Sequence, residues 1–167
     1  MGVSPTIRPA VEQDDAALRE VDRATWSSLT SPAPVPDWST RPHFFGPDRG
    51  PEGFLVAVLD GRVIGFVGLH QQIGTPAHAH VLTIDGLGVL PSVRGRGVGR
   101  ALVEGALARA EEQGVWKVGL RVLGHNHEAR RLYERCGFEV EGILRGEFHL
   151  DGRDVDDVLM ARRLAGD

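Results

Sequence analysis

The chain has 167 residues, of which 41% are hydrophobic and 25% charged, a composition typical of one soluble domain with a single core. Its formal net charge of −4 argues against a nucleic-acid partner, because nucleic-acid-binding proteins usually carry a basic face. Its single cysteine, Cys136, excludes an internal disulfide and a zinc site built from several cysteines, so we expect no metal.

The sequence favours a cytoplasmic setting without membrane contact. No apolar run approaches the roughly 20 residues that a bilayer span needs. The first residues lack the basic and then apolar pattern of a signal peptide. A single cysteine is typical of a reducing compartment. Lys117 is the only lysine among many arginines, a bias typical of a GC-rich bacterial genome.

The first third of the chain predicts a short strand, a helix and a long loop. Residues 6–10 predict the strand, and apolar residues at helical spacing predict a helix within residues 11–29, capped by Asp14 or Asp15. Residues 30–53 are rich in proline and glycine and predict a loop with at most a turn or two of helix. Loops of this length in compact domains often bind ligands or cover a site.

The middle of the chain predicts three strands, a helix and a further strand. Residues 54–70 predict a β-hairpin, because two runs rich in Val, Ile and Phe meet at Asp60–Gly61, a sequence that favours a type I′ turn. Residues 78–91 predict the third strand. A helix is expected over residues 100–114 and a strand over residues 115–123.

The remaining elements complete a mixed α/β sheet. Asn126 is expected to cap a short helix that ends before Gly137. Residues 138–164 predict two strands around a turn at Asp151–Gly152. The order of the elements therefore predicts a mixed sheet of about seven strands, with about four helices packed on it.

The segment VRGRGVG, Val93–Gly99, follows a predicted strand and opens a predicted helix. This context presents unpaired backbone N–H groups at the positive end of a helix dipole, which suits a phosphate group. The dinucleotide fingerprint fails, because Arg100 stands where its third glycine should fall, and the Gly-Lys-Ser/Thr of a Walker A loop is missing. A phosphate-binding turn and a glycine-rich packing turn both remain open from these residues alone.

Two segments together resemble the GCN5-related N-acetyltransferase (GNAT) superfamily. The first, GVLPSVRGRGVGRAL, is similar to its acetyl-CoA signature, with matches at Arg94, Gly97 and Gly99. The second, NHEARRLYERCGFEVEG, resembles its Asn-x-x-Ala-x-x-Leu-Tyr-x-x-x-Gly-Phe pattern. The matching residues of this second segment are Asn126, Ala129, Leu132, Tyr133, Gly137 and Phe138.

The resemblance covers nearly the whole chain and implies one GNAT domain over residues 1–167. Residues 6–113 would form an N-terminal half that holds the acetyl-CoA loop. Residues 114–163 would form a C-terminal half that holds an acid tyrosine and the final hairpin. In this family the sheet is mostly antiparallel, and the strand before the glycine loop splays from its neighbour.

The resemblance also implies how acetyl-CoA would be held. In this family the backbone of the splayed strand binds the pantetheine arm, so the N–H of Leu87 would polarise the thioester carbonyl and Val89 would pair with a pantetheine amide. Asn126 and Tyr133 would contact the cofactor from the other side of the splay. Backbone amides of the loop would hold the pyrophosphate; they belong to Arg94, Gly95, Arg96, Gly97, Val98, Gly99 and Arg100.

The implied chemistry is direct attack of a primary amine on the thioester in a ternary complex, with Tyr133 as the acid that protonates the leaving thiolate. Asp85 is the first candidate for the base, directly or through water. Thr83, Asp85, Leu87 and Val89 share a face if their strand is regular, whereas a bulge would break that alternation. The alternative bases are Thr83, His80, His78 or water alone.

The acceptor is open from the sequence. Aromatic residues in the early helix, the long loop and the last hairpin predict a pocket for a small-molecule amine or an amino acid, although these rings also suit core packing. They are Trp26, Trp38, His43, Phe44, Phe45, Phe148 and His149. The alternatives are a ribosomal-protein or peptide N-terminus, and a non-catalytic acyl-CoA sensor. Gly86 and Gly88 could make room for acyl groups longer than acetyl. The resemblance also implies a homodimer, because members of this family often dimerise.

Overall fold

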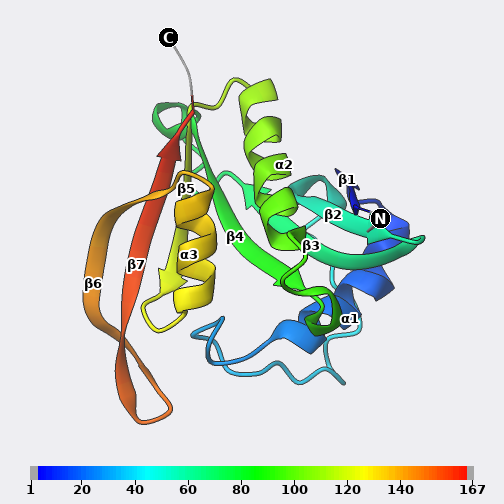
Figure 1. Ribbon diagram of the computed structural model, residues 1–167, viewed down its shortest axis with the longest axis horizontal. Coiled ribbons are helices and arrows are strands. Elements are labelled where there is room, and N and C mark those ends of the chain that lie inside the picture. The colour runs from blue at the N-terminus through cyan, green and yellow to red at the C-terminus, as the bar shows by residue number, and fades with distance from the viewer. Residues whose placement is uncertain (1–3, 165–167) are drawn as a thin grey trace.

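A twisted seven-stranded sheet with helices on both faces organises the computed structural model, which describes residues 4–164 (Figure 1). The helices are α1 (Asp15–Thr25), α2 (Val98–Glu112) and α3 (His127–Arg135). The strands are β1 (Thr6–Pro9), β2 (Phe54–Leu59), β3 (Arg62–His70), β4 (Val81–Val89), β5 (Lys117–Leu123), β6 (Glu139–Leu150) and β7 (Arg153–Arg163). Their order in the sheet is β1-β2-β3-β4-β5-β7-β6.

The pairing confirms the predicted mixed, mostly antiparallel α/β sheet. Only β4 and β5 pair in parallel within residues 4–164, and the other neighbours are antiparallel. Both predicted hairpin turns have positive φ at their two central residues. These φ angles are 50° and 75° at Asp60 and Gly61, and 50° and 75° at Asp151 and Gly152. A type I′ turn requires that backbone, so local sequence determines where both hairpins reverse.

The prediction of about four helices was one too many, since residues 4–164 contain three α-helices and four single turns of 3-10 helix. The expected N-terminal helix is also shorter than residues 11–29. Asp14 is its N-cap residue but makes no capping bond through its side chain, and Asp15 is already its first residue. Asp14 binds Arg8 and the N–H of Val11, whereas Asp15 accepts hydrogen bonds from the N–H groups of Phe44 and Phe45. The side chains of Asp14 and Asp15, which the local pattern predicted as helix caps, therefore form hydrogen bonds with other segments instead.

The larger hydrophobic core lies between the sheet and the helices α2 and α3, and a smaller one lies under α1 on the opposite face. Leu102 of α2 has no exposed surface, and one of its methyl groups lies 3.1 Å from where a Cβ of Gly65 in β3 would sit. The missing side chain at Gly65 therefore lets α2 approach the sheet closely. No helix within residues 4–164 is both long and apolar enough to cross a bilayer.

Replacing Leu102 by alanine is expected to lower the free energy of unfolding by about 2–5 kcal/mol, because it leaves a cavity in the larger core. Leu144→Ala is the matched control, since the Leu144 side chain in β6 is 39% exposed. Urea unfolding followed by circular dichroism measures both variants. Equal destabilisation of the two would contradict the assignment of Leu102 to the core.

The sheet splays between β4 and β5. These strands pair only from Val81 opposite Lys117 to Ile84 opposite Leu120. Beyond that point Arg121–Leu123 continue to pair with β7, while β4 continues to pair with β3. Figure 1 shows β4 and β5 diverging toward the end of the sheet where the loop after β4 begins. The divergence confirms the splayed sheet and leaves one edge of β4 without a neighbouring strand.

Candidate active site

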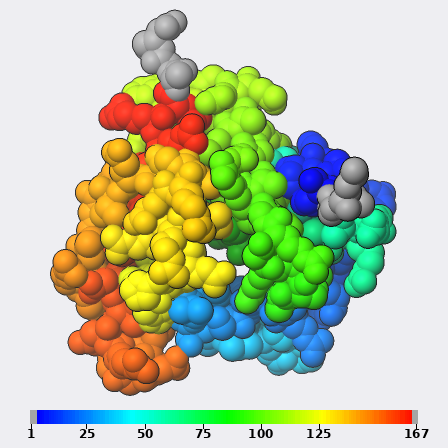
Figure 2. Space-filling model, in the orientation of Figure 1, coloured from blue at the N-terminus to red at the C-terminus, as the bar shows by residue number. Residues whose placement is uncertain are grey.

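A cavity of about 970 Å³ runs through the splay, from the loop before α2 to α1 and the long loop that follows it. Figure 2 shows a hollow at the centre of this face, bordered by α3 in yellow, the loop before α2 in green and the early loop in blue. We call the part beside α2 and α3 the cofactor end, and the part beside α1 and residues 26–50 the acceptor end. The structure thus brings together the two segments on which the family resemblance rests.

The glycine loop at the cofactor end presents backbone donors to the cavity. Gly95 and Gly97 have φ angles of 75° and 80°, a left-handed backbone that glycine adopts without strain. Gly97 is the N-cap of α2, and the first bond of the helix runs from the N–H of Ala101 to the carbonyl of Gly97 at 3.0 Å. The N–H groups of the first helical turn have no partner within the helix, so they suit an anion at the positive end of the dipole.

The two arginines of this loop and Arg100 in the first turn of α2 differ in their surroundings. Arg94 donates from Nε to the carbonyl of Val89 at 3.2 Å, and Arg100 pairs with Glu104 of the same helix at 2.7 Å. Both line the cavity. Arg96 is exposed, and its side chain does not belong to the cavity wall. The loop therefore offers its backbone to a phosphate more directly than its charged side chains.

The free edge of β4 faces the splay, and it carries the two backbone N–H groups, of Leu87 and Val89, that are expected to bind the pantetheine arm. The N–H of Leu90 donates to the carbonyl of Ile64 in β3 at 2.9 Å. Opposed residues of antiparallel strands alternate between hydrogen-bonded and non-hydrogen-bonded pairs, so Gly88 and Gly86 bond to β3. The N–H groups of Leu87 and Val89 then point away from β3 and into the gap beside β5.

A bulge in β4 separates the side chains that a regular strand would align. Gly68 pairs with Gly86 and Leu69 with Ile84, so Asp85 is the extra residue of β4. Leu87 packs on the core under α2, whereas Asp85 lies over Gly68. The common face of Thr83, Asp85, Leu87 and Val89 is therefore broken, because the bulge interrupts the alternation.

The absence of a side chain at Gly88 in β4 leaves room for Phe66 and for Thr25 of α1. A Cβ at Gly88 would lie 2.7 Å from the ring of Phe66 and 3.2 Å from Oγ1 of Thr25. The space at Gly88 is thus filled by Phe66 and α1, which argues against the idea that it accommodates a longer acyl chain. At Gly86 the ring of Phe66 lies 3.5 Å away, at ordinary contact distance.

Tyr133 and Asn126 reach the cavity from the other side of the splay. The oxygen of Asn126 accepts from the N–H of Ala129 at 3.2 Å, which confirms the predicted cap of α3. Tyr133 is 7% exposed and packs edge-on against Phe138 at 5.8 Å. Burial raises the pKa of its phenol, so the phenol is protonated at neutral pH and is a weaker acid than an exposed tyrosine. Cys136 is buried behind it, outside the cavity wall.

Of the four candidate bases, Asp85 and Thr83 line the cavity, and the two histidines lie elsewhere. Oδ2 of Asp85 lies 3.3 Å from Nδ1 of His70, and both residues line the cavity. His80 stacks on Trp116 at 4.1 Å at the far end of β4, and His78 precedes it in a 3-10 turn. Neither belongs to the cavity wall, which favours Asp85 over both.

The acceptor end carries charged groups that sequence reasoning missed. Among the missed side chains that line the cavity are Asp22, Arg41, Arg49, His70 and Arg121. Asp22 is 7% exposed and lies 3.4 Å from Arg41, and burial raises the pKa of its carboxyl. Arg121 pairs with the buried Asp157. Within residues 4–164 no group of three His, Cys, Asp or Glu side chains could hold a metal ion.

One signal in the sequence pointed toward two of these residues without identifying them. The long proline-rich loop predicted a binding segment, and Arg41 and Arg49 belong to it.

Most of the aromatic residues expected in the pocket lie outside the cavity wall. Phe44 is 2% exposed in the core under α1, and the His43 and His149 side chains are 72% and 70% exposed. Trp26 and Phe148 do line the cavity.

Comparisons with known proteins agree with this architecture. The sequence profile described as the acetyltransferase (GNAT) family matches residues 17–138. A phosphinothricin N-acetyltransferase from Alcaligenes faecalis is 35% identical over 119 residues, which cover 68% of this chain and 58% of that protein. The chain thus matches little more than half the length of that curated relative.

Two solved structures share the fold over nearly the whole chain. A GCN5-related N-acetyltransferase from Kribbella flavida is 29% identical with a TM-score of 0.75, and the match covers 96% of this chain and 98% of that one. A phosphinothricin acetyltransferase from Sinorhizobium meliloti, solved in complex with acetyl-CoA, is 20% identical with a TM-score of 0.80, and the match covers 97% of this chain and 89% of that one. The chain belongs to the acetyltransferase (GNAT) family.

Proposed function

We propose that the protein is an acetyl-CoA-dependent N-acetyltransferase that moves an acetyl group to the primary amine of a small molecule or an amino acid. One observation carries this proposal. A glycine loop with free helix N–H groups and a free strand edge with outward N–H groups border the same cavity. Phosphate and pantetheine need these two kinds of donor, and the acceptor end continues the same cavity.

The residues of the cofactor end fit coenzyme A. The amides from Arg94 to Arg100 would hold its pyrophosphate, because the left-handed backbone at Gly95 and Gly97 leaves no side chain in the way. The N–H groups of Leu87 and Val89 would pair with the pantetheine arm, which would add to β4 as a strand does. Bound acetyl-CoA would supply the acetyl thioester.

Three groups of the chain would then carry the chemistry by direct attack in a ternary complex. The N–H of Leu87 would polarise the thioester carbonyl. Asp85, paired with His70, would accept a proton from the incoming amine, and the nitrogen would bond to the carbonyl carbon as the carbon–sulfur bond breaks. Tyr133 would deliver a proton to the departing sulfur, for which a protonated phenol is required.

A small acceptor is favoured because the early loop covers part of the acceptor end. The Ser28 hydroxyl donates to Asp151 in the β6–β7 turn at 2.6 Å, and the ring of His125 lies 3.0 Å from the carbonyl of Ser28. These contacts carry the loop across the cavity to the C-terminal part of the sheet. A free small molecule reaches such a partly covered space more easily than the end of a folded protein does.

Replacing Asp85 by asparagine is expected to lower turnover at neutral pH about 10- to 100-fold and to shift the rise of turnover with pH. Asparagine keeps the size of the side chain but cannot accept the proton. Steady-state thiol release between pH 6 and 9 measures the effect. Asp60→Asn is the control, since Asp60 lies at the tip of the β2–β3 hairpin, outside the cavity wall. An unchanged pH profile would send the search for the base to Thr83, His80 or water.

The proposed function is tested first by calorimetric titration with acetyl-CoA, then by a thiol-release screen over amino acids, polyamines, aminoglycosides and N-terminal peptides. Micromolar binding with turnover on a small amine is the expected result. Turnover on peptides alone would replace the small acceptor with a peptide N-terminus. Binding without turnover would favour a sensor, and no binding would end the proposal.

The expected homodimer is a separate prediction, and light scattering of the full chain measures it.

A further inference from the structure

We infer that Arg49, seated in the wall of the acceptor end, binds a carboxylate carried by the acceptor amine, so that the acceptor is an amino acid or another amine with a carboxylate. This inference rests on the proposed acetyl transfer and narrows its substrate class. It starts from a single feature, a partly buried guanidinium that forms no ion pair with an acidic side chain of residues 4–164.

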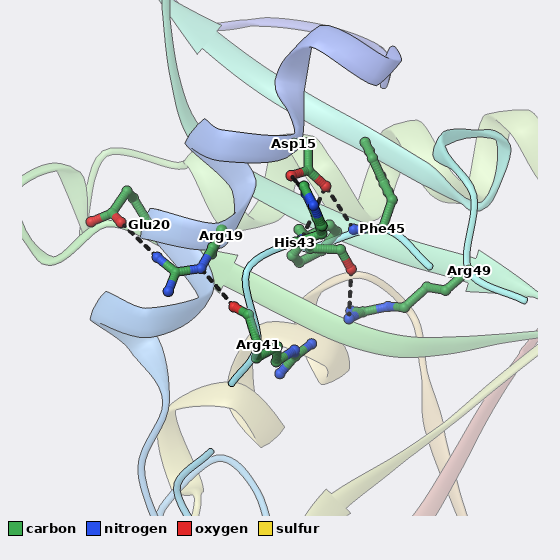
Figure 3. Close-up of polar contacts among 8 residues, drawn as sticks. Asp15, Arg19, Glu20, Arg41, His43, Phe45 and Arg49 are labelled. Carbon is green, nitrogen blue, oxygen red and sulfur yellow. Dashed lines mark hydrogen bonds and ion pairs between the residues drawn. The ribbon is translucent and has the colours of Figure 1, made fainter. Parts of the chain in front are cut away.

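The surroundings of Arg49 are mostly apolar. Its guanidinium lies 4.2 Å from the ring centre of Phe44 and 4.9 Å from that of Phe54. Within residues 4–164 the guanidinium donates one hydrogen bond, which is long, from Nη1 to the carbonyl of Phe44 at 3.5 Å (Figure 3). Burial lowers the pKa of Arg49, yet an arginine remains charged at any physiological pH. The fold thus holds a permanent charge in a place that disfavours it.

The other arginine of the loop shows the contrast. Arg41 lies 3.4 Å from the carboxylate of Asp22 and over the rings of Trp26 and Trp38, at 5.9 and 5.5 Å. Arg49, by comparison, forms no ion pair with any carboxylate of residues 4–164. Asp22 and Asp85 act on its charge only from a greater distance. The cavity wall therefore holds the ion pair of Arg41 and Asp22, and also Arg49, whose guanidinium has N–H donors without a carboxylate to bind.

A carboxylate matches those donors. A guanidinium presents its N–H groups as a fork that fits the two oxygens of a carboxylate, and such charge-assisted bonds are strong where water is excluded. Asp85 lines the same cavity and is near enough for its charge to act on Arg49. A molecule with its carboxylate at Arg49 can therefore present an amine to Asp85, the proposed base. An acceptor that carries both groups satisfies both side chains.

The alternative is that Arg49 only fastens the loop to the core. Figure 3 shows other polar contacts that already hold the loop against α1. Asp15 accepts from the N–H groups of Phe44 and Phe45 at 3.0 and 2.8 Å, and Arg19 donates to the carbonyl of Arg41 at 2.8 Å. A purely structural arginine would affect all acceptors alike. A carboxylate-binding arginine affects only those acceptors that carry the carboxylate.

The first experiment compares α-amino acids with their carboxamides as acceptors, in the full chain and at saturating acetyl-CoA. The native protein is expected to prefer the acid over its amide by about 10- to 100-fold in kcat/KM, as a charge-assisted bidentate bond predicts. In Arg49→Gln that preference should fall to about one, mainly through KM, and Arg49→Lys should restore part of it. Arg23→Gln, an equal charge change on the exposed side of α1, should keep it.

The second experiment measures binding without turnover. Glutarate and its uncharged diamide are titrated into the full chain with saturating coenzyme A, which occupies the glycine loop. The native protein should bind glutarate at least tenfold more tightly, and Arg49→Gln should abolish the difference. If that pattern holds while no amine is acetylated, the carboxylate site stands and the proposed acetyl transfer fails. Equal binding of the two compounds, or a preference for acids that survives in Arg49→Gln, would overturn the inference.

Discussion

Replacing Gly97 by glutamate is expected to lower the affinity for acetyl-CoA at least 100-fold. An ideal Cβ at this position meets no protein atom within 4 Å, so a side chain here would project into space that the proposal assigns to the pyrophosphate. The glutamate would add a negative charge beside those phosphates and would block the N–H donors at the start of α2. Calorimetric titration with acetyl-CoA measures the loss.

Backbone strain needs a control of its own, because Gly97 has a φ of 80° that other residues rarely adopt. Gly114 is a matched position. Its φ is 73°, its surroundings are equally open, and it follows the far end of α2. Gly114→Glu should therefore carry a similar strain and the same charge, yet bind acetyl-CoA as the native chain does. Equal affinity in both variants would remove the glycine loop from the cofactor site.

Replacing Tyr133 by phenylalanine is expected to lower kcat about 100-fold while the affinity for acetyl-CoA changes less than about threefold. The substitution removes only the hydroxyl and keeps the ring that packs on Phe138. Because burial raises the pKa of Tyr133, its ionisation should not lower the turnover of the native protein below about pH 10. Steady-state thiol release and calorimetry separate the effect on turnover from the effect on binding.

Packing and proton delivery can be told apart at this site with a second variant. Phe138→Leu disturbs the same edge-on contact but leaves the hydroxyl of Tyr133 in place. It should cost stability, as the loss of a buried ring does, while kcat stays within a fewfold of the native value. Native turnover in Tyr133→Phe would exclude the phenol as the acid. A loss in Phe138→Leu as large as in Tyr133→Phe would assign the effect to packing.

The features that the sequence determined by itself are local ones. The turns at Asp60–Gly61 and Asp151–Gly152 follow from residue types that tolerate positive φ. The cap at Asn126 and the left-handed glycines before α2 follow from their own few neighbours along the chain. The alternation and spacing of apolar residues then predicted each strand and the order of the elements. Each of these features depends on backbone preferences within a few residues.

The tertiary structure alone decided the acceptor end. Asp85 meets His70 because a bulge interrupts the pairing of β4 with β3, and a bulge adds one residue without a clear local signal. Asp22 meets Arg41 because Asp15 fastens the loop to α1. Arg49 lies among phenylalanines from the loop and β2 and has no acidic partner within residues 4–164, an arrangement that no local pattern encodes. Charges from distant segments acquire their partners, or lack them, only once the chain has folded.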